Sequence, residues 1–524
     1  MNAGLRRGSL IVAASLLLLS ACATAPPAVA NRAASRALPD PEDTHLGGRF
    51  LQRDAHGELS GYRLLSTGID GLAARVEIIR AAERTLDLQY YIFRGDQAGL
   101  LVARELRRAA DRGVRIRLLV DDGDTAPGDE QILLLDGYRN IEVRVFNPFD
   151  SRTHNLLLRN LDFLLHRARL DYRMHNKLLV CDNAIALVGG RNIGNQYFQI
   201  DPGSQFADDD VFVAGRIVPT LSRSFDDFWN SDMSIGAAVL LRTGSGSRAG
   251  QGADEHVASG TEGGYQVRID SGEPLAGLLD GRTPLVWTSA RVVYDSPDKK
   301  RVERRRQHGR LMSAAVNTQI AAVQRELLMV SPYFVPSQGE LAQLRQLRQQ
   351  GAGIRVLSNS LESAPNMAAY SGYQKVRVPL LQEGVELYEV RALIDDTRGS
   401  GQGRRVSRYG NYALHAKLYV FDRARLFVGS WNYDQRSLRI NTEIGLIIES
   451  DELAGEVAGR FEQMTRPQEA YHVVLKTTAG NRPALTWNTE INHLPFETGR
   501  EPARGWWQRL RVRLLALLPL QPEL

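Results

Sequence analysis

The stretch HNKLLVCD at positions 175–182 returns as HAKLYVFD at positions 415–422. The offset is 240 residues, and the same offset carries Asn192 onto Asn432 and the segment 113–116 onto 353–356. Several separate matches at one spacing indicate that a whole domain has been duplicated. With 524 residues the chain is also too long for a single hydrophobic core, which agrees with two domains.

Alternating strands and helices surround each copy. In the first half, the patterns predict strands over 85–93, 114–120 and 141–146 and a helix over 98–112. The second half repeats the order, with strands over 326–333, 354–358 and 385–390 and helices over 339–350 and 370–383. This alternation predicts an α/β fold, and the duplication predicts two α-β-α sandwich domains in tandem.

Composition and the repeat together suggest where the domains begin and end. A stretch rich in glycine and poor in apolar residues, 243–264, separates the two halves and is typical of a flexible linker. We expect a signal peptide over 1–21, a tether over 22–50, domain one over 51–240, a linker or insertion over 241–290, domain two over 291–475 and a tail over 476–524.

The N-terminus has the pattern of a secretory signal. Arg6 and Arg7 precede an apolar run, and small residues lead to Cys22. The run is too short to cross a bilayer as a mature helix. LSAC at 19–22 resembles a bacterial lipobox, which implies acylation of Cys22 and a lipid-anchored protein of the cell envelope that faces the periplasm. In that class of lipoprotein, Ala23 after the cysteine implies the outer membrane. An ordinary signal peptide with an incidental cysteine is the alternative.

Charge and cysteine content exclude several classes of function. The net charge of +5 falls by two if Arg6 and Arg7 are removed, which by itself is too little to indicate nucleic acid or an acidic membrane as a partner. Cys22 and Cys181 are the only cysteines, so the chain has no disulfide framework, and we expect Cys181 to be a buried filler. No cluster of carboxylates and histidines has metal-binding spacing, so we expect neither a metal nor another cofactor.

The repeated motif carries the chemistry. Residues two apart on a strand point to one face, so His175 and Lys177 project together, as do His415 and Lys417. A hairpin at the turn signal 182–183 would return the chain so that the glycines at 189–190 and the Asn192 amide lie beside them. Two imidazoles, two ammonium groups and two amides suit a phosphodiester. The cations stabilise phosphate charge, one imidazole can attack phosphorus, and the other can protonate the leaving oxygen.

HxKxxxxD followed by Gly-x-x-Asn, present twice, resembles the HKD motif of the phospholipase D superfamily, over about residue 51 to about residue 470. The resemblance implies pseudo-twofold symmetry and one active site at the domain interface. It also implies a phosphohistidine on one histidine, with Lys177, Lys417, Asn192 and Asn432 holding the phosphate. Asp182 and Asp422 would be structural.

In that superfamily an acidic residue downstream orients each histidine. We match these residues to Asp210 and Glu443, each in a strand-like run after its motif. Asp208 and Asp209 compete for the first role. Trp431, before the second loop asparagine, departs from the usual small residue, and we expect it to stack or to face the membrane.

The chain is most similar to bacterial cardiolipin synthases, especially the lipobox-bearing type C branch. Four stretches carry this resemblance: LDLQYYIF (86–93), VVYDSPDK (292–299), SPYFVPS (331–337) and LLQEGVELYEVR (380–391). It implies transfer of a phosphatidyl group from phosphatidylglycerol or phosphatidylethanolamine to a second phosphatidylglycerol. Hydrolysis of phospholipid or nucleic acid by the same route is one alternative, and a non-catalytic lipid-binding scaffold is another. Two motifs and a lipid anchor argue against nucleic acid, and a protein partner stays open.

Two further segments could meet a membrane. Residues 505–518 (GWWQRLRVRLLALL) place Trp506, Leu510 and Leu514 on one helical arc with arginines on either side, which is typical of an interfacial helix. A terminal helix docked on the core is the alternative. The basic run 299–310 could contact anionic head groups, or it could be a solvated helix face.

Overall fold

The computed structural model describes residues 34–51, 56–124, 130–149, 162, 165–200, 204–243, 276–278, 282–300, 311–392, 411–477 and 483–517. The predicted signal peptide, Cys22 and most of the predicted linker lie outside these ranges. So do residues 301–310 of the basic run. No helix within the described ranges is long and apolar enough to cross a membrane.

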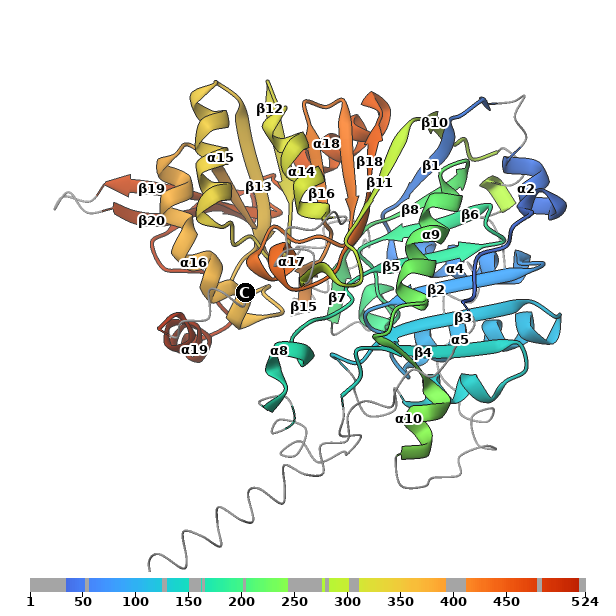
Figure 1. The fold of residues 1–524 in the computed structure, drawn as a ribbon. Helices are drawn as coiled ribbons and strands as arrows, with labels where there is room; N and C mark the ends of the chain where they lie inside the picture. Colours follow the sequence, from blue (N-terminus) through green and yellow to red (C-terminus); the bar gives the residue numbers. More distant parts are fainter. Residues whose placement is uncertain are drawn as a thin grey trace, which may run out of the picture.

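The first half forms a nine-stranded sheet (Figure 1). Its strand order is β10-β1-β8-β6-β5-β2-β3-β4-β9. The strands β2, β3 and β4 run parallel, and the others pair antiparallel. Their bounds are β1 (Ser60–Leu65), β2 (Thr85–Tyr90), β3 (Arg115–Asp121), β4 (Ile141–Phe146), β5 (Lys177–Cys181), β6 (Ile185–Gly189), β8 (Asp210–Gly215), β9 (Ser234–Gly236) and β10 (Val286–Thr288).

The second half forms a ten-stranded sheet with the order β11-β18-β17-β16-β12-β13-β14-β19-β20-β21. Its first seven strands match β1-β8-β6-β5-β2-β3-β4 one for one, which confirms the duplication. Their bounds are β11 (Ala290–Tyr294), β12 (Glu326–Val330), β13 (Gly353–Asn359), β14 (Glu386–Val390), β16 (Leu418–Phe421), β17 (Arg425–Gly429), β18 (Ile444–Glu449), β19 (Ala470–Thr477), β20 (Pro483–Ile491) and β21 (Leu494–Thr498).

Three hydrophobic clusters make this a layered α/β molecule. One cluster packs α4 (Gly68–Ala81) and α5 (Gln97–Asp111) on the first sheet. Another packs α14 (Met312–Ala321), α15 (Gln338–Gln349) and α16 (Met367–Gln382) on the second sheet. The third lies between the sheets, where α9 (Val218–Trp229) and α18 (Asp451–Met464) join strand residues of both halves. The halves therefore share a core.

Two outer segments differ from the expected boundaries. Part of the expected tether is folded, because α2 (His45–Phe50) buries Leu46 and Phe50 against the first sheet. Part of the expected tail is also folded, because β20 and β21 extend the second sheet and α19 (Trp506–Ala516) follows them. Among the residues that the structure describes, the first half has no strands equivalent to β20 and β21, so the repeat could not reveal them.

Candidate active site

Both histidines lie at the junction of the two halves, each just before a strand of its own motif. The His175 backbone N–H donates to the Thr442 carbonyl at 2.9 Å, and the His415 N–H donates to the Ala207 carbonyl at 2.8 Å. Ala207 ends β7 (Ser204–Ala207), which pairs in parallel with β15 (Asn411–Leu414) of the other half. Each motif is therefore tied to the opposite half, as pseudo-twofold symmetry requires.

A carboxylate from the opposite half also holds each imidazole. His175 Nδ1 lies 2.8 Å from Glu443 Oε2, and His415 Nδ1 lies 2.5 Å from Asp208 Oδ2. Each acid directly follows the residue whose carbonyl accepts the histidine N–H. With Nδ1 directed at a carboxylate, the Nε2 lone pair of the neutral ring is free to react.

Asp210 does not orient a histidine, so that match is wrong. It is buried and forms ion pairs with Arg75 at 2.8 Å and Arg191 at 3.2 Å. The register of the two sheets gives the reason: Asp210 pairs with Gly189, and its counterpart Gly445 pairs with Gly429. Glu443 lies two residues before Gly445, so its counterpart lies two residues before Asp210. That residue is Asp208, the competitor named from the sequence.

The two lysines are buried beside the histidines. Lys177 Nζ donates to the His175 carbonyl at 2.6 Å, and Lys417 Nζ donates to the His415 carbonyl. Lys417 Nζ also lies 2.9 Å from His415 Nδ1, so Asp208 and Lys417 flank that nitrogen. Burial lowers the pKa of Lys417 to about 8 and lowers the pKa of Lys177 well below its ordinary value.

The electrostatics differ between the two His–acid pairs. Burial, reinforced by the nearby lysine charges, lowers the pKa of His415 to about 3 and that of His175 well below its usual value, which favours the neutral form of both rings. Burial raises the pKa of Glu443 to about 7. Burial acts in the same direction on Asp208, but His415 and Lys417 outweigh it and lower the pKa of Asp208 below its usual range. Asp208 is therefore the more firmly ionised acid.

Aromatic rings enclose the imidazoles. The Tyr91 ring meets His175 edge-on at 5.1 Å, the Tyr197 ring meets His415 edge-on at 5.2 Å, and Phe206 stacks on His415. Asn192 Nδ2 donates to the Tyr197 hydroxyl at 2.9 Å. The first loop amide thus supports a ring that packs on the histidine of the other half. The sequence motifs did not single out these rings, although Tyr91 lies within LDLQYYIF.

Asn432 occupies the matching position in the second half. It is 4% exposed, and its side-chain oxygen has no hydrogen-bond partner among the residues described. Trp431 beside it is fully buried and packs edge-on against Tyr419 and Tyr433. Of the two expectations for Trp431, exposure to a membrane is therefore wrong, and aromatic stacking is confirmed, in edge-on form, by its ring contacts.

Comparison with known proteins gives the same assignment for both halves. Residues 76–229 and 316–465 match the family model described as cardiolipin synthase, phospholipase D-like domain. The chain belongs to this family.

Individual relatives agree with the family assignment. Cardiolipin synthase C of Escherichia coli is 34% identical over 460 residues, covering 87% of this chain and 94% of the relative. A cardiolipin synthase of Halalkalibacterium halodurans is 24% identical, covering 76% of this chain and 65% of the relative. A phosphatidylserine synthase crystal structure from Haemophilus influenzae superposes with a TM-score of 0.51 at 14% identity, over 81% of this chain and 88% of that one, which supports the fold.

The last residue of each motif in this phospholipase D-like chain lies away from the reacting groups. Asp182 accepts three backbone N–H groups, from residues 83, 84 and 85, and Asp422 accepts three from residues 324, 325 and 326. Each aspartate has a positive φ at the turn of its hairpin. The contacts join the hairpin to the start of a parallel strand, which is a structural arrangement.

A buried ion pair that the sequence motifs do not reveal lies behind Glu443. Lys299 is fully buried, and its Nζ donates to Asp295 at 2.9 Å and to the carbonyls of Ser437 and Asn441. Asp295 in turn accepts the Glu443 backbone N–H at 3.1 Å. Lys299 is therefore an internal support and cannot contact head groups. Asp295 and Lys299 both lie in the stretch VVYDSPDK, which in the sequence indicated only a family resemblance.

Within the described ranges, no group of three or more His, Cys, Asp or Glu side chains could hold a metal.

Proposed function

We propose that this protein transfers phosphatidyl groups between membrane phospholipids and so makes cardiolipin. Phosphatidylglycerol is the acceptor, and phosphatidylglycerol or phosphatidylethanolamine is the donor. The pair of imidazoles, each held at Nδ1 by the acid of the opposite half, is the observation that carries the proposal. Membership of the cardiolipin synthase family supports the choice of lipid as substrate.

In the first step, His175 Nε2 attacks the phosphorus of the donor. A P–N bond forms, the P–O bond to the head group breaks, and the leaving oxygen takes a proton from His415. The choice of His175 rests on the unequal acids. Once an anionic phosphodiester has entered, ionised Asp208 favours the protonated, imidazolium form of His415. Glu443, with a pKa of about 7, is less fully ionised and therefore favours the imidazolium form of His175 less.

In the second step, the acceptor hydroxyl passes its proton to His415 and attacks the phosphorus. The P–N bond breaks, and His175 is regenerated. Lys177 and Lys417 stabilise negative charge on the non-bridging oxygens throughout, because a buried ammonium interacts strongly with nearby charge. The amides of Asn192 and Asn432 complete the phosphate site in this scheme.

The reaction is tested by product analysis. Membranes carrying the protein receive labelled phosphatidylglycerol, with and without phosphatidylethanolamine, and labelled cardiolipin is the expected product. Phosphatidic acid alone would contradict transfer and indicate hydrolysis, and lipid binding without turnover would indicate a scaffold. His175→Ala and His415→Ala should each abolish turnover. A phospho-adduct trapped on His175 supports the proposed nucleophile, and an adduct on His415 alone reverses the two roles.

We also propose that Cys22 is acylated and anchors the protein in the outer membrane, facing the periplasm. The lipobox-like sequence and Ala23 support this placement. Cys22→Ser should abolish incorporation of labelled palmitate and release the chain from the outer-membrane fraction. Continued incorporation in that variant would contradict acylation at this cysteine.

A further inference from the structure

The C-terminal helix α19 is turned outward. Its large apolar residues are exposed: Trp506 (57%), Trp507 (60%), Leu510 (38%), Leu514 (55%) and, just after the helix, Leu517 (81%). At about 100° per residue these five side chains fall within one arc of about 100°. Val512, on the other side, is the buried member of the helix. An amphipathic surface helix normally buries its apolar arc, so the exposed arc of α19 lacks the usual cover.

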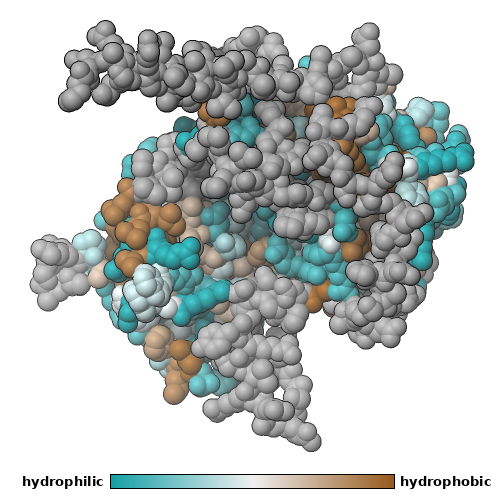
Figure 2. Space-filling model, turned by 90° about the horizontal axis from the view of Figure 1, so that it is seen from below, coloured by the Kyte–Doolittle hydropathy of each residue, from teal (hydrophilic) through white to brown (hydrophobic). Residues whose placement is uncertain are grey.

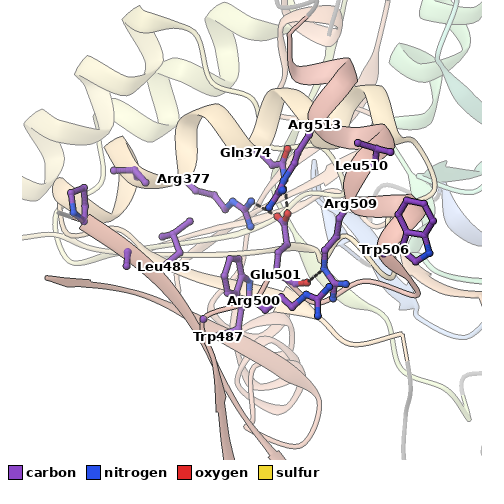
Figure 3. Close-up of a pocket in the computed structure, with 14 residues that line it drawn as sticks. Gln374, Arg377, Leu485, Trp487, Arg500, Glu501, Trp506, Arg509, Leu510 and Arg513 are labelled. Carbon is purple, nitrogen blue, oxygen red and sulfur yellow. Dashed lines mark hydrogen bonds and ion pairs between the residues drawn. The ribbon is translucent and has the colours of Figure 1, made fainter. Parts of the chain in front are cut away.

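Arginines flank the exposed arc. Arg511 lies on one side, and Arg509 and Arg513 lie on the other. A groove of about 790 Å³ is lined by Arg509, Arg513 and Arg500, together with Trp506 and Leu510. Figure 3 shows Glu501 inside this groove, between Arg377 and Arg509. Together with burial, the neighbouring charges of Arg500 and Arg513 lower the pKa of Arg509. The groove is lined by more arginines than acidic residues, and this excess of positive charge is complementary to an anionic surface.

Hydrogen bonds connect this helix and the residues just before it to the segment that follows β13. Gln508 Nε2 donates to the Leu361 carbonyl at 2.7 Å, and Arg504 donates to the Glu362 carbonyl at 2.6 Å. These carbonyls follow the end of β13, where Asn359 Nδ2 donates to the Leu414 carbonyl, one residue before His415. In Figure 1, α19 lies at the lower side of the second half and α18 at the upper side. Figure 2, seen from below, shows hydrophobic patches on the left of this lower face.

We propose that the exposed arc of α19, with its flanking arginines, docks the protein onto an anionic phospholipid bilayer. Tryptophan rings are favoured at the boundary between head groups and acyl chains, and arginines are attracted to anionic head groups. Docking through α19 would hold the site-bearing edge of the second sheet against the surface that supplies the lipid. This inference rests on the proposed function for the reason to dock, but it can be tested without turnover.

The test places an environment-sensitive fluorophore on α19. The full chain carries Cys22→Ser, so that acylation cannot anchor it, and Trp507→Cys supplies the label site; the remaining Cys181 is fully buried. Vesicles of phosphatidylcholine with phosphatidylglycerol should shift the emission to the blue, and pure phosphatidylcholine should do so much less. Glu456→Cys on α18, an exposed position on the opposite side, is the matched control and should not respond.

An unchanged label at position 507 would overturn the proposal. A blue shift that grows with protein concentration in the absence of vesicles would also overturn it, because a second copy would then cover the arc. Reversing two charges with Arg511→Glu and Arg513→Glu should weaken binding to anionic vesicles at least about tenfold. Equal binding by this variant would contradict the role of the arginines.

Activity separates a failure of docking from a failure of the proposed function. Trp506→Ser with Leu510→Ser should lose turnover on vesicles but keep it on short-chain phosphatidylglycerol dispersed in detergent. Leu494→Ser with Phe496→Ser removes exposed apolar side chains from β21 and serves as the control, which should retain both activities. A label that responds in a chain without any turnover would leave docking intact and contradict only the reaction. Equal vesicle turnover in both double variants would contradict docking.

Discussion

At the scale of single residues, the site contains two groups whose pKa values lie near neutrality. Lys417, with a pKa of about 8, must be protonated to stabilise phosphate, so activity should fall as pH rises through about 8. Glu443, with a pKa of about 7, should hold His175 best when ionised, so activity should rise as pH passes about 7. We therefore expect a narrow bell-shaped profile of kcat/KM against pH.

Two variants assign the limbs of this profile. Lys417→Arg carries a guanidinium that stays protonated throughout the measured pH range, so the alkaline limb should move out of that range even if the rate is lower. Glu443→Gln cannot ionise, so the acid limb near pH 7 should disappear. An alkaline limb that stays near pH 8 in Lys417→Arg would mean that another group controls it.

The neighbouring acids Asp208 and Asp210 should have opposite phenotypes. Asp208→Asn removes the charge that holds His415, and the rate should fall by about two to four orders of magnitude while the protein stays folded. Asp210→Asn leaves Arg75 and Arg191 buried without their shared counter-charge and should destabilise the protein by about 3–5 kcal/mol. Turnover and thermal unfolding of both variants distinguish the roles, and a stable, inactive Asp210→Asn would reverse them.

The same two residues show how far the sequence predicts the site. Repetition identifies His175, Lys177, His415 and Lys417, because both copies place the same residue types at the same spacing. It could not choose among three consecutive aspartates at 208–210, because the offset between the halves changes from 240 residues and only strand register defines the counterpart of Glu443. The aromatic rings that pack on the histidines could not be predicted from the sequence, because their segments meet the histidines only in the folded chain.

At the scale of elements, periodicity predicted the strands and helices around each motif to within a few residues, since each buries an apolar face in a sheet sandwich. The tail was harder because β20 and β21 lie at a sheet edge, where strands such as β21 are largely exposed and lack a strong apolar pattern. The sequence did not decide the orientation of α19 either, because its pattern is compatible both with an interfacial helix and with a helix docked on the core.

The hairpin aspartates offer a test at this scale. Asp182→Asn keeps the left-handed turn but replaces an acceptor oxygen with an amide, so at least one of its three backbone N–H partners loses its bond. We expect destabilisation by about 1–3 kcal/mol with the activity of the folded protein retained. Asp422→Asn is the matched variant. Because Asp422 is less buried, water can replace the lost bond, and the cost should be smaller. Denaturation midpoints of both variants measure the difference, and equal midpoints would contradict this account.

At the scale of the whole molecule, one hydrophobic cluster belongs to both halves. Leu178 and Val180 of the first sheet lie in it together with Leu418 and Val420 of the second. The catalytic contacts also cross the junction, since His175 uses Glu443 and His415 uses Asp208. The duplication therefore produced a single unit of folding and function, in which neither half contains a complete His–acid pair.

Separating the halves tests this unity. The chain passes from the first sheet to the second at Ser289, between β10 and β11, so residues 1–289 and 290–524 can be expressed as two chains. Each alone would expose its side of the shared core, and we expect insoluble or aggregated protein without turnover. Expressed together, they should associate and recover activity, because the shared core and both His–acid pairs can re-form. A first half with His175→Ala should associate equally well and remain inactive, which separates association from catalysis. A soluble, monomeric single half with turnover would contradict this account.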